Sequence, residues 1–382
     1  MNRLRALLLF AALAVAFVLA RGVRHDVPPP AEPALAIGRV LGEPAPDPGF
    51  ARTLAPREFS FPADHGPHPA FRTEWWYFTG NLATPQGRPF GFQLTFFRHA
   101  LTPDRAQSAS AWRNRDVMLA HFAISDPQAE RFLHRARTQR AALGLAGASA
   151  DPPAAWLRDW RCELVAPDEW KLHAEDADYA LDLRVRMVKA LVPQGDRGLS
   201  QKSDEAGNAS YYYSGTRLEA RGELRLGAAR EPVSGTVWLD REWSTSALGR
   251  DQTGWDWFAL QLDDGAELMF YQLRRADGTS DAHSAGVYVD ATGKVVRLAR
   301  EDVAIAVDAR WRSPHSGADY PARWRLVVPR AGLDVDVAPR LADQEWTGTL
   351  VYWEGAVTVR PRNGRAAGVG YVELTGYGAP AR

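Results

Sequence analysis

The recurrence of short strand-like segments, separated by turn signals, constrains this 382-residue chain more than any other feature of its sequence. Apolar, branched and aromatic residues mark six such segments, at 74–82, 90–98, 117–124, 181–188, 210–226 and 235–239. No long helical pattern interrupts them. The Arg-rich stretch 130–145 lacks a clean apolar stripe, and we expect it to be a surface helix or a loop. The pattern predicts an all-β protein made of antiparallel sandwiches or closed barrels.

Two aromatic hairpins of similar sequence indicate an internal duplication. The segment 75–82 reads WWYFTGNL, the segment 255–262 reads WDWFALQL, and each then turns at a glycine. The return strands, 92–98 and 268–274, both end in arginine. We interpret the similarity as two related domains, although short aromatic strands can also converge by composition.

The chain divides into an N-terminal extension and these two domains. Residues 26–56 form a Pro/Ala-rich linker, and the two domains are expected at 57–246 and 247–382. An eight-stranded barrel can enclose one small ligand. The 14 tryptophans suit the wall of an apolar pocket, although they suit a plain core equally well.

The extreme N-terminus has the order of a secretory signal. Arg3 and Arg5 precede an uninterrupted apolar run at 6–20. Residues 1–25 are therefore expected to be either a cleaved signal peptide or an uncleaved anchor. The protein is then exported to the periplasm or cell envelope, and in the second case it stays attached to the inner membrane.

Charge and cysteine content exclude several classes of protein. Lys plus Arg and Asp plus Glu both number 46, so no net positive charge favours nucleic acid as a partner. The single cysteine, Cys162, excludes an internal disulfide framework and a thiolate metal cluster. No Gly-x-Ser-x-Gly elbow and no phosphate-binding loop occurs.

Several motifs resemble those of one known family. The segments 61–68 (FPADHGPH) and 74–82 (EWWYFTGNL) resemble the opening signature of the AttH-like and carotenoid 1,2-hydratase family. Later blocks agree with it: HFA at 121–123, SQKS at 200–203, DREWS at 240–244 and GYVELTGY at 370–377. The resemblance covers the chain from about Pro56 onward. It implies two consecutive lipocalin-like antiparallel β-barrel domains.

The resemblance also implies two kinds of function. One branch of the family hydrates a terminal double bond of acyclic carotenoids. The other comprises exported proteins labelled predicted hydrolases, often linked to transporter operons, and this chain looks closer to it. The hydratases carry an Asp-His-x-Trp motif at the position of residues 240–243, and in this chain Arg241 replaces the histidine of that motif. An arginine does not donate a proton near neutral pH, so the same hydration mechanism would need different residues. An ABC-transporter permease is the partner that the second branch implies.

The candidate catalytic residues are carboxylic acids: Asp240, Glu242 and Glu74. Asp240 and Glu242 are two residues apart, so on a regular strand they share a face, and adjacent carboxyl groups can separate into an acid and a base. In this hypothesis Glu242 donates the proton and Asp240 acts as the base or orients the water. The alternative is an ion pair involving Arg241 and other surface or rim arginines. The candidate ligand-binding residues are Trp75, Trp76, Tyr77, His121, Tyr213, Trp243, Trp255, Trp257 and Tyr271.

His65, His68 and Glu74 have the side chains that a zinc site needs, but their spacing is weak evidence and no helical His-Glu-x-x-His occurs. No metal and no other cofactor is therefore predicted. Two functional classes stay open. The protein is either a binding module for an apolar molecule such as a lipid or isoprenoid, or a hydratase-like or hydrolase-like enzyme acting on one.

Overall fold

The computed structural model describes residues 35–36, 49–104, 115–246, 248–348, 350–362, 364 and 367–378. The predicted signal or anchor and most of the linker lie outside these residues. Within the described ranges, no helix has the length and apolarity required to cross a membrane. The described elements are strands and three short 3₁₀ helices: η1 (Ala63–His65), η2 (Arg300–Asp302) and η3 (Pro329–Ala331).

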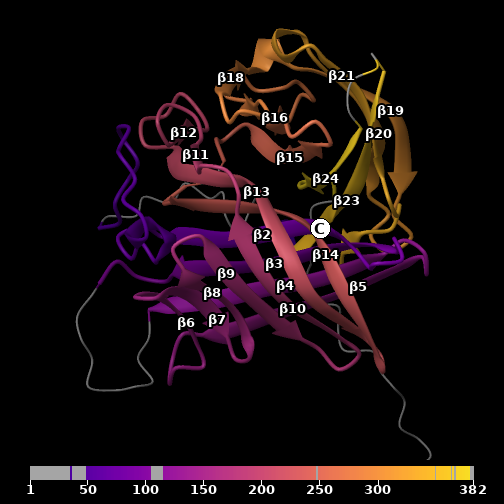
Figure 1. Cartoon of the computed structure of the whole chain (residues 1–382). Coiled ribbons are helices and arrows are strands. Elements are labelled where there is room, and N and C mark those ends of the chain that lie inside the picture. Colours follow the sequence, from indigo (N-terminus) through magenta and orange to yellow (C-terminus); the bar gives the residue numbers. More distant parts are fainter. Residues whose placement is uncertain are drawn as a thin grey trace, which may run out of the picture. The chain divides into compact units, whose positions relative to one another are not determined.

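Within the described residues, the first and second sheets contain thirteen and eleven strands. Figure 1 labels the strands of the first sheet. They are β2 (Thr73–Ala83), β3 (Pro89–Ala100), β4 (Asp116–Asp126), β5 (Arg131–Arg140), β6 (Ala146–Ala150), β7 (Pro153–Leu157), β8 (Trp160–Ala166), β9 (Glu169–Glu175), β10 (Tyr179–Met187), β11 (Val192–Pro193), β12 (Leu199–Gln201), β13 (Ala209–Leu226) and β14 (Ala229–Ser244). The antiparallel path runs β5-β4-β3-β2-β14-β13-β10-β9-β8-β7-β6, with β11 and β12 beside β13.

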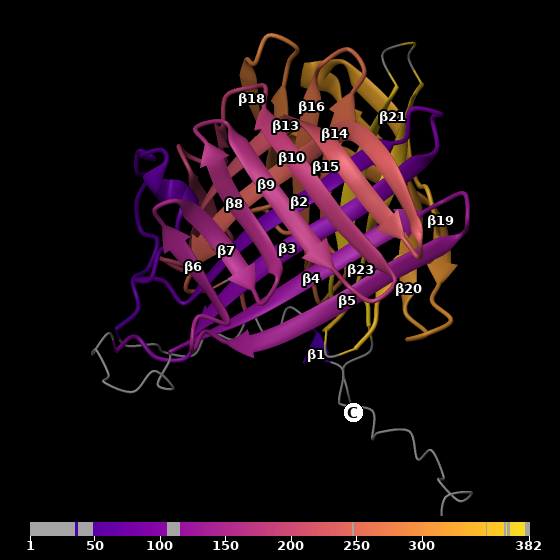
Figure 2. The same cartoon turned by 60° about the horizontal axis from the view of Figure 1, so that its bottom comes forward.

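This first sheet curls on itself. Strand β7 contacts β3, β4 and β5, which lie at the other end of the ladder. The curled sheet surrounds a continuous apolar core that includes Trp76, Phe92 and Trp160, all fully buried. Figure 2 shows the long strands of this sheet crossing the molecule. The result is a nearly closed barrel.

The second sheet contains eleven strands. They are β1 (Leu35–Ala36), β15 (Gln252–Leu262), β16 (Glu267–Arg275), β17 (Ala285–Val289), β18 (Val295–Ala299), β19 (Ala304–Arg312), β20 (Asp319–Val328), β21 (Leu333–Pro339), β22 (Glu345–Trp346), β23 (Leu350–Pro361) and β24 (Gly368–Leu374). The main path is β18-β17-β16-β15-β24-β23-β21-β20-β19. It encloses a second core around Phe258, Trp324 and Trp353.

The two barrels pack against each other through the strands that carry the duplicated motif. Strand β2 contacts β24, β3 contacts β23, and β13 contacts β15. The interface has its own apolar cluster, which includes Tyr77 and Tyr212 from the first sheet and Trp257 and Met269 from the second. Both faces of β2 are therefore buried, since alternate residues of a strand point to opposite faces. This explains why aromatic residues are consecutive in β2 rather than alternating with polar ones.

The structure confirms the all-β prediction and the two consecutive barrel-like domains. Both predicted hairpins form, β2 with β3 in the first sheet and β15 with β16 in the second. Strand β14 ends at Ser244 and β15 begins at Gln252, so the proposed boundary after residue 246 falls between the sheets.

The expectation of a surface helix or loop at 130–145 was wrong, because β5 occupies most of that stretch. It is an edge strand whose arginines reach outward to acidic groups; Arg135 Nε, for example, lies 3.0 Å from Asp176 Oδ2. Charged side chains commonly protect the exposed edge strand of a sheet from pairing with other chains. Because β5 carries so many of them, its sequence lacks the alternation of apolar and polar residues by which a strand is recognised.

Candidate functional site

The main pocket lies between the two barrels. The space between its atoms is about 800 Å³, a volume that includes open solvent at its mouth. Residues from both sheets line it: Trp75, Tyr77, Phe97, Lys202, Tyr212, Asp240 and Glu242 from the first domain, and Leu248, Trp255, Trp257, Tyr271, Leu273, Tyr352, Glu354 and Glu373 from the second half of the chain. The domains thus share one pocket.

Asp240 and Glu242 point from β14 into this pocket, as their spacing predicted. Asp240 accepts hydrogen bonds from the hydroxyls of Tyr212 and Ser214, both at 2.5 Å, and from Trp238 Nε1 at 2.8 Å. Burial raises the pKa of Asp240 to about 7, even though these three donors favour the carboxylate.

Glu242 has an ion-pair partner in the pocket that the sequence reasoning did not assign. Lys202 Nζ lies 3.1 Å from Glu242 Oε1, and the hydroxyl of Ser210 donates to the same oxygen. Burial disfavours the ammonium of Lys202, but Glu242, Tyr271 and Asp240 together outweigh it, and the pKa of Lys202 is raised. The ammonium also lies 4.2 Å from the ring centre of Tyr271, within cation–π range. This end of the pocket therefore holds a neutralised pair of charges.

Glu354 and Glu373 form a second acidic pair. They are direct cross-strand neighbours on β23 and β24, and both line the pocket. The hydroxyl of Tyr77 donates to Glu354 Oε1 at 2.5 Å, and Trp255 Nε1 donates to Glu373 Oε1 at 3.1 Å. The side chain of Glu354 is 1% exposed, and its Oε2 has no hydrogen-bond partner in the described part of the chain.

The electrostatics of this second pair favour the protonated acids. Burial, followed by repulsion from Glu373, raises the pKa of Glu354 well above its usual value. Burial also raises the pKa of Glu373, and the charges of Asp240 and Glu242 act in the same direction. Two carboxyl groups in register cannot both ionise easily in a dry site. The pair therefore holds at least one proton at neutral pH.

Aromatic rings form the remaining walls. Tyr77 and Trp257 meet edge to face with ring centres 5.2 Å apart, which joins β2 to β15. Trp257 Nε1 donates to the Tyr212 hydroxyl at 3.3 Å. Of the residues predicted to bind ligand, five line the pocket: Trp75, Tyr77, Trp255, Trp257 and Tyr271.

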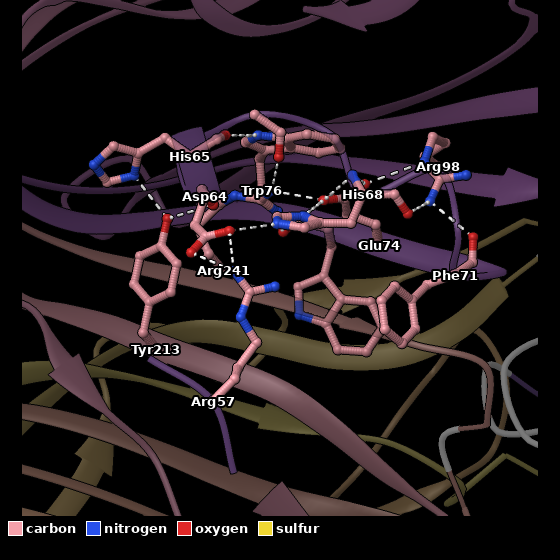
Figure 3. A network of polar contacts seen from close by, with 12 residues as sticks. Arg57, Asp64, His65, His68, Phe71, Glu74, Trp76, Arg98, Tyr213 and Arg241 are labelled. Carbon is pink, nitrogen blue, oxygen red and sulfur yellow. Dashed lines mark hydrogen bonds and ion pairs between the residues drawn. The ribbon is translucent and has the colours of Figure 1, made fainter. Parts of the chain in front are cut away.

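The third predicted carboxylate, Glu74, alternates with the pocket residue Trp75 along β2 and therefore lies on the opposite face of the strand. Figure 3 shows it within a network that includes His68 and Arg98. It is fully buried and accepts from Arg241 Nη2 at 2.8 Å and from Arg98 Nε at 3.1 Å. His68 Nδ1 lies 2.6 Å from the same carboxylate. Burial alone favours the neutral acid, but Arg241, His68 and Arg98 outweigh it and hold the pKa of Glu74 far below its usual range. Arg241 thus pairs with Glu74 and not with the two carboxylates beside it on β14.

This network connects the loop before β2 to the first barrel and does not form a metal site. His65 Nδ1 lies 2.7 Å from the Tyr213 hydroxyl, whereas His68 bonds Glu74, so the two histidines have separate partners. Among the described residues, no group of three or more His, Cys, Asp or Glu side chains has an arrangement that holds a metal. Burial lowers the pKa of His65 to about 3, so it is neutral.

Four predicted ligand-binding residues do not line the pocket. Trp76, Tyr213 and Trp243 surround the Glu74 network, where the guanidinium of Arg241 lies 4.0 Å from the ring centre of Trp76. His121 contacts a residue of the pocket wall from outside the pocket, with its Nδ1 2.7 Å from the hydroxyl of Tyr352. Burial lowers the pKa of His121 to about 3.

The sequence did not predict eight residues that line the pocket: Phe97, Lys202, Tyr212, Leu248, Leu273, Tyr352, Glu354 and Glu373. Three of them, Lys202, Glu354 and Glu373, are charged. Each lies in a segment that showed a detectable signal, a single charge within a strand or block that is otherwise apolar or uncharged: VYWEGA for Glu354, GYVEL for Glu373 and SQKS for Lys202. A lone charge in a buried strand needs a partner or a pocket.

Comparison with known proteins agrees with the fold. The sequence matches the model of the family described as AttH-like over residues 52–377. A crystal structure of a candidate AttH from Nitrosomonas europaea is 35% identical, with a TM-score of 0.77 over 86% of this chain and all of that one. No curated protein matches significantly.

Two further crystal structures share the fold at low identity. Kievitone hydratase from Nectria haematococca is 13% identical, with a TM-score of 0.65 over 86% of this chain and 96% of that one. CghA with Sch210972 is 12% identical, with a TM-score of 0.52 over 87% of this chain and 97% of that one. These likenesses concern the fold alone.

Proposed function

Because this chain belongs to the AttH-like family and shares its fold with kievitone hydratase, we propose that it binds an apolar small molecule between its barrels and either adds water across a carbon–carbon double bond or eliminates water from an alcohol to form one. The observation that carries the proposal is that a pair of cross-strand carboxyl groups, whose pKa burial raises, and a hydrogen-bonded aspartate line one aromatic pocket. Alkene hydration needs an acid, a surface that tolerates a carbocation, and a base for the water.

The roles follow from the hydrogen bonds. The Glu354–Glu373 pair retains a proton and transfers it to an alkene carbon. The faces of Trp75, Trp255 and Trp257 then stabilise the tertiary cation. Water adds to the cation and its proton passes to Asp240, so the net change is one alkene plus one water to one alcohol. Solvent exchange returns the proton to the acidic pair.

Glu242 receives a different role from the one its sequence suggested. Its Oε1 already has two partners within the protein, the ammonium of Lys202 and the hydroxyl of Ser210. We therefore move the donor role to the Glu354–Glu373 pair and keep Asp240 as the base.

A labelled-water assay tests the reaction. The purified protein is incubated with an acyclic isoprenoid alkene in ¹⁸O-water, and mass spectrometry follows incorporation of one labelled water. Glu354→Gln preserves the acceptor for Tyr77 but removes the acid, and it is expected to lower the rate by about 100-fold or more. Glu301→Gln, the same change at an exposed position, is the control and keeps full activity.

A carrier without chemistry is the second candidate, and the aromatic wall of the pocket favours it equally. In that case the isoprenoid changes the tryptophan fluorescence of the protein but is recovered without label. Failure of the isoprenoid to bind at all contradicts both candidates.

The cellular setting is also part of the proposal: export to the periplasm or cell envelope, a lipid or isoprenoid as the ligand, and an ABC-transporter permease as a partner. Its support is the charged and apolar order of residues 1–20 and the resemblance to transporter-linked relatives. N-terminal sequencing of protein recovered from a periplasmic fraction tests export. A mature N-terminus near residue 21 is expected for a cleaved signal, and protein confined to the cytoplasm contradicts export.

A further inference from the structure

The acidic groups of the pocket outnumber its bases. Asp240, Glu242, Glu354 and Glu373 line it together with one cationic side chain, Lys202. Lys202 forms its ion pair with Glu242, so Asp240, Glu354 and Glu373 have no ion-pair contact with a cation among the residues that line the pocket. Without a ligand, the protein can reduce this excess of negative charge by keeping some of the carboxyl groups protonated. The hydrogen-bond donors that line the site, however, favour the ionised form.

One carboxyl oxygen is left for a ligand. Oε2 of Glu354 is buried and accepts no hydrogen bond within the described residues, although Oε1 is bonded to Tyr77. An unpartnered acceptor in a buried side chain is costly unless something occupies the site. Its cross-strand neighbour Glu373 opens onto the same space.

Besides carboxyl groups, a site for an organic cation needs aromatic walls, and this pocket has them. Trp75, Trp255 and Trp257 line the pocket together with Tyr77 and Tyr352. Indole and phenol faces attract ammonium groups, and aromatic cages bind quaternary ammonium ions in this way. The Lys202 ammonium already uses one such face, that of Tyr271, at the other end of the site.

From this combination we propose that the pocket binds apolar organic cations, such as quaternary ammonium compounds, with the positive charge held by Glu354, Glu373 and Asp240 against the tryptophan rings. The inference rests on the proposed function, because a stable ammonium ion has the charge of the carbocation formed during hydration. It adds a ligand class, since the same site then recognises molecules that are cationic before any reaction.

A matched pair of ligands isolates the charge. Benzyltrimethylammonium and neopentylbenzene have the same shape, and only the first is charged. In fluorescence titrations near neutral pH, the cation is expected to bind about tenfold more tightly or better. Glu354→Gln and Glu373→Gln should each remove most of this preference while binding of neopentylbenzene is unchanged. Glu301→Gln, remote from the pocket, should keep the preference.

Proton release gives an independent measurement. A permanent cation should displace protons from the acidic groups, so calorimetric enthalpies of binding should depend on the ionisation enthalpy of the buffer. The groups that face the bound charge are Asp240 and Glu242 on β14, Glu354 and Tyr352 on β23, Glu373 on β24, Tyr77 on β2, Tyr212 on β13, Tyr271 on β16 and Lys202 after β12. Release should fall in the Glu354→Gln and Glu373→Gln variants.

The outcomes separate the two proposals. Equal affinity for the two ligands, or a preference that survives both glutamine variants, overturns the cation site and leaves the apolar pocket standing. Failure of the cation to bind also overturns the cation site, whereas the proposed hydration is refuted separately, by the isoprenoid and the labelled-water assay. A cation preference lost in both variants, with buffer-dependent enthalpy, supports the cation site.

Discussion

Replacement of Asp240 by asparagine should change how stability depends on pH. The pKa of Asp240 is about 7 in the folded protein, because the group is buried, against a value near 4 for an unfolded chain. Between these values the folded state holds a proton that the unfolded state has lost. Stability from this group is therefore fully present below about pH 4 and is lost as the pH rises towards 7.

The size of the effect follows from the shift. Each pH unit across this window lowers the free energy of unfolding by about 1.4 kcal/mol, so the full loss is at most about 4 kcal/mol. The introduced asparagine does not titrate, and its side chain can still bond Ser214, Trp238 and Tyr212. The variant should therefore gain stability relative to the wild type as the pH rises from about 4 to 8.

Urea unfolding followed by tryptophan fluorescence at several pH values measures the difference. Glu354 and Glu373 titrate in both proteins, so most of their contribution cancels in the comparison. A difference between wild type and Asp240→Asn that stays constant across this range contradicts the argument that burial raises the pKa of Asp240 to about 7.

Two further predictions concern buried ion pairs. Glu74→Gln leaves Arg98 and Arg241 without their carboxylate and should lower the free energy of unfolding by about 3–5 kcal/mol, measured as a lower urea midpoint. Because Glu74 faces away from the pocket, the affinity of the folded variant for an apolar probe should be unchanged. A urea midpoint equal to that of Glu301→Gln contradicts the role of Glu74 in this network. Glu267→Gln removes the partner of Lys189 and Arg217, which reach it from the first domain at 2.9 and 2.5 Å. It should cost about 3 kcal/mol and separate the unfolding of the two domains in calorimetry, and a single unshifted transition contradicts that coupling.

Much of the fold was predictable because strand signals are local. The consecutive aromatics of β2 identified a strand, and the similar sequence of β15 identified the second hairpin. The error at β5 arose because an edge strand protects itself with charge, and its arginines concealed the alternation.

The site was predictable only in part, because it depends on packing between domains. The spacing of Asp240 and Glu242 predicted a shared face, and the structure places both on the pocket. Nothing local distinguishes Glu74 from them, yet one residue's difference in register turns it to the opposite face, where Arg241 meets it. The pairing of Glu354 with Glu373 required the register of β23 on β24, which the sequence did not reveal.

The doubly buried strand β2 has a consequence for how the chain can be divided. A cut in the connection after Ser246 would leave the first barrel with Trp75 and Tyr77 facing water, and the second with Trp257 uncovered. Such apolar faces aggregate or seek a complementary surface. Here the apolar surface of each fragment is complementary to that of the other fragment. The main effect of the segment that links the two barrels is therefore to keep each at a high effective concentration near the other. Two co-expressed halves should therefore reassemble and rebuild the shared cavity.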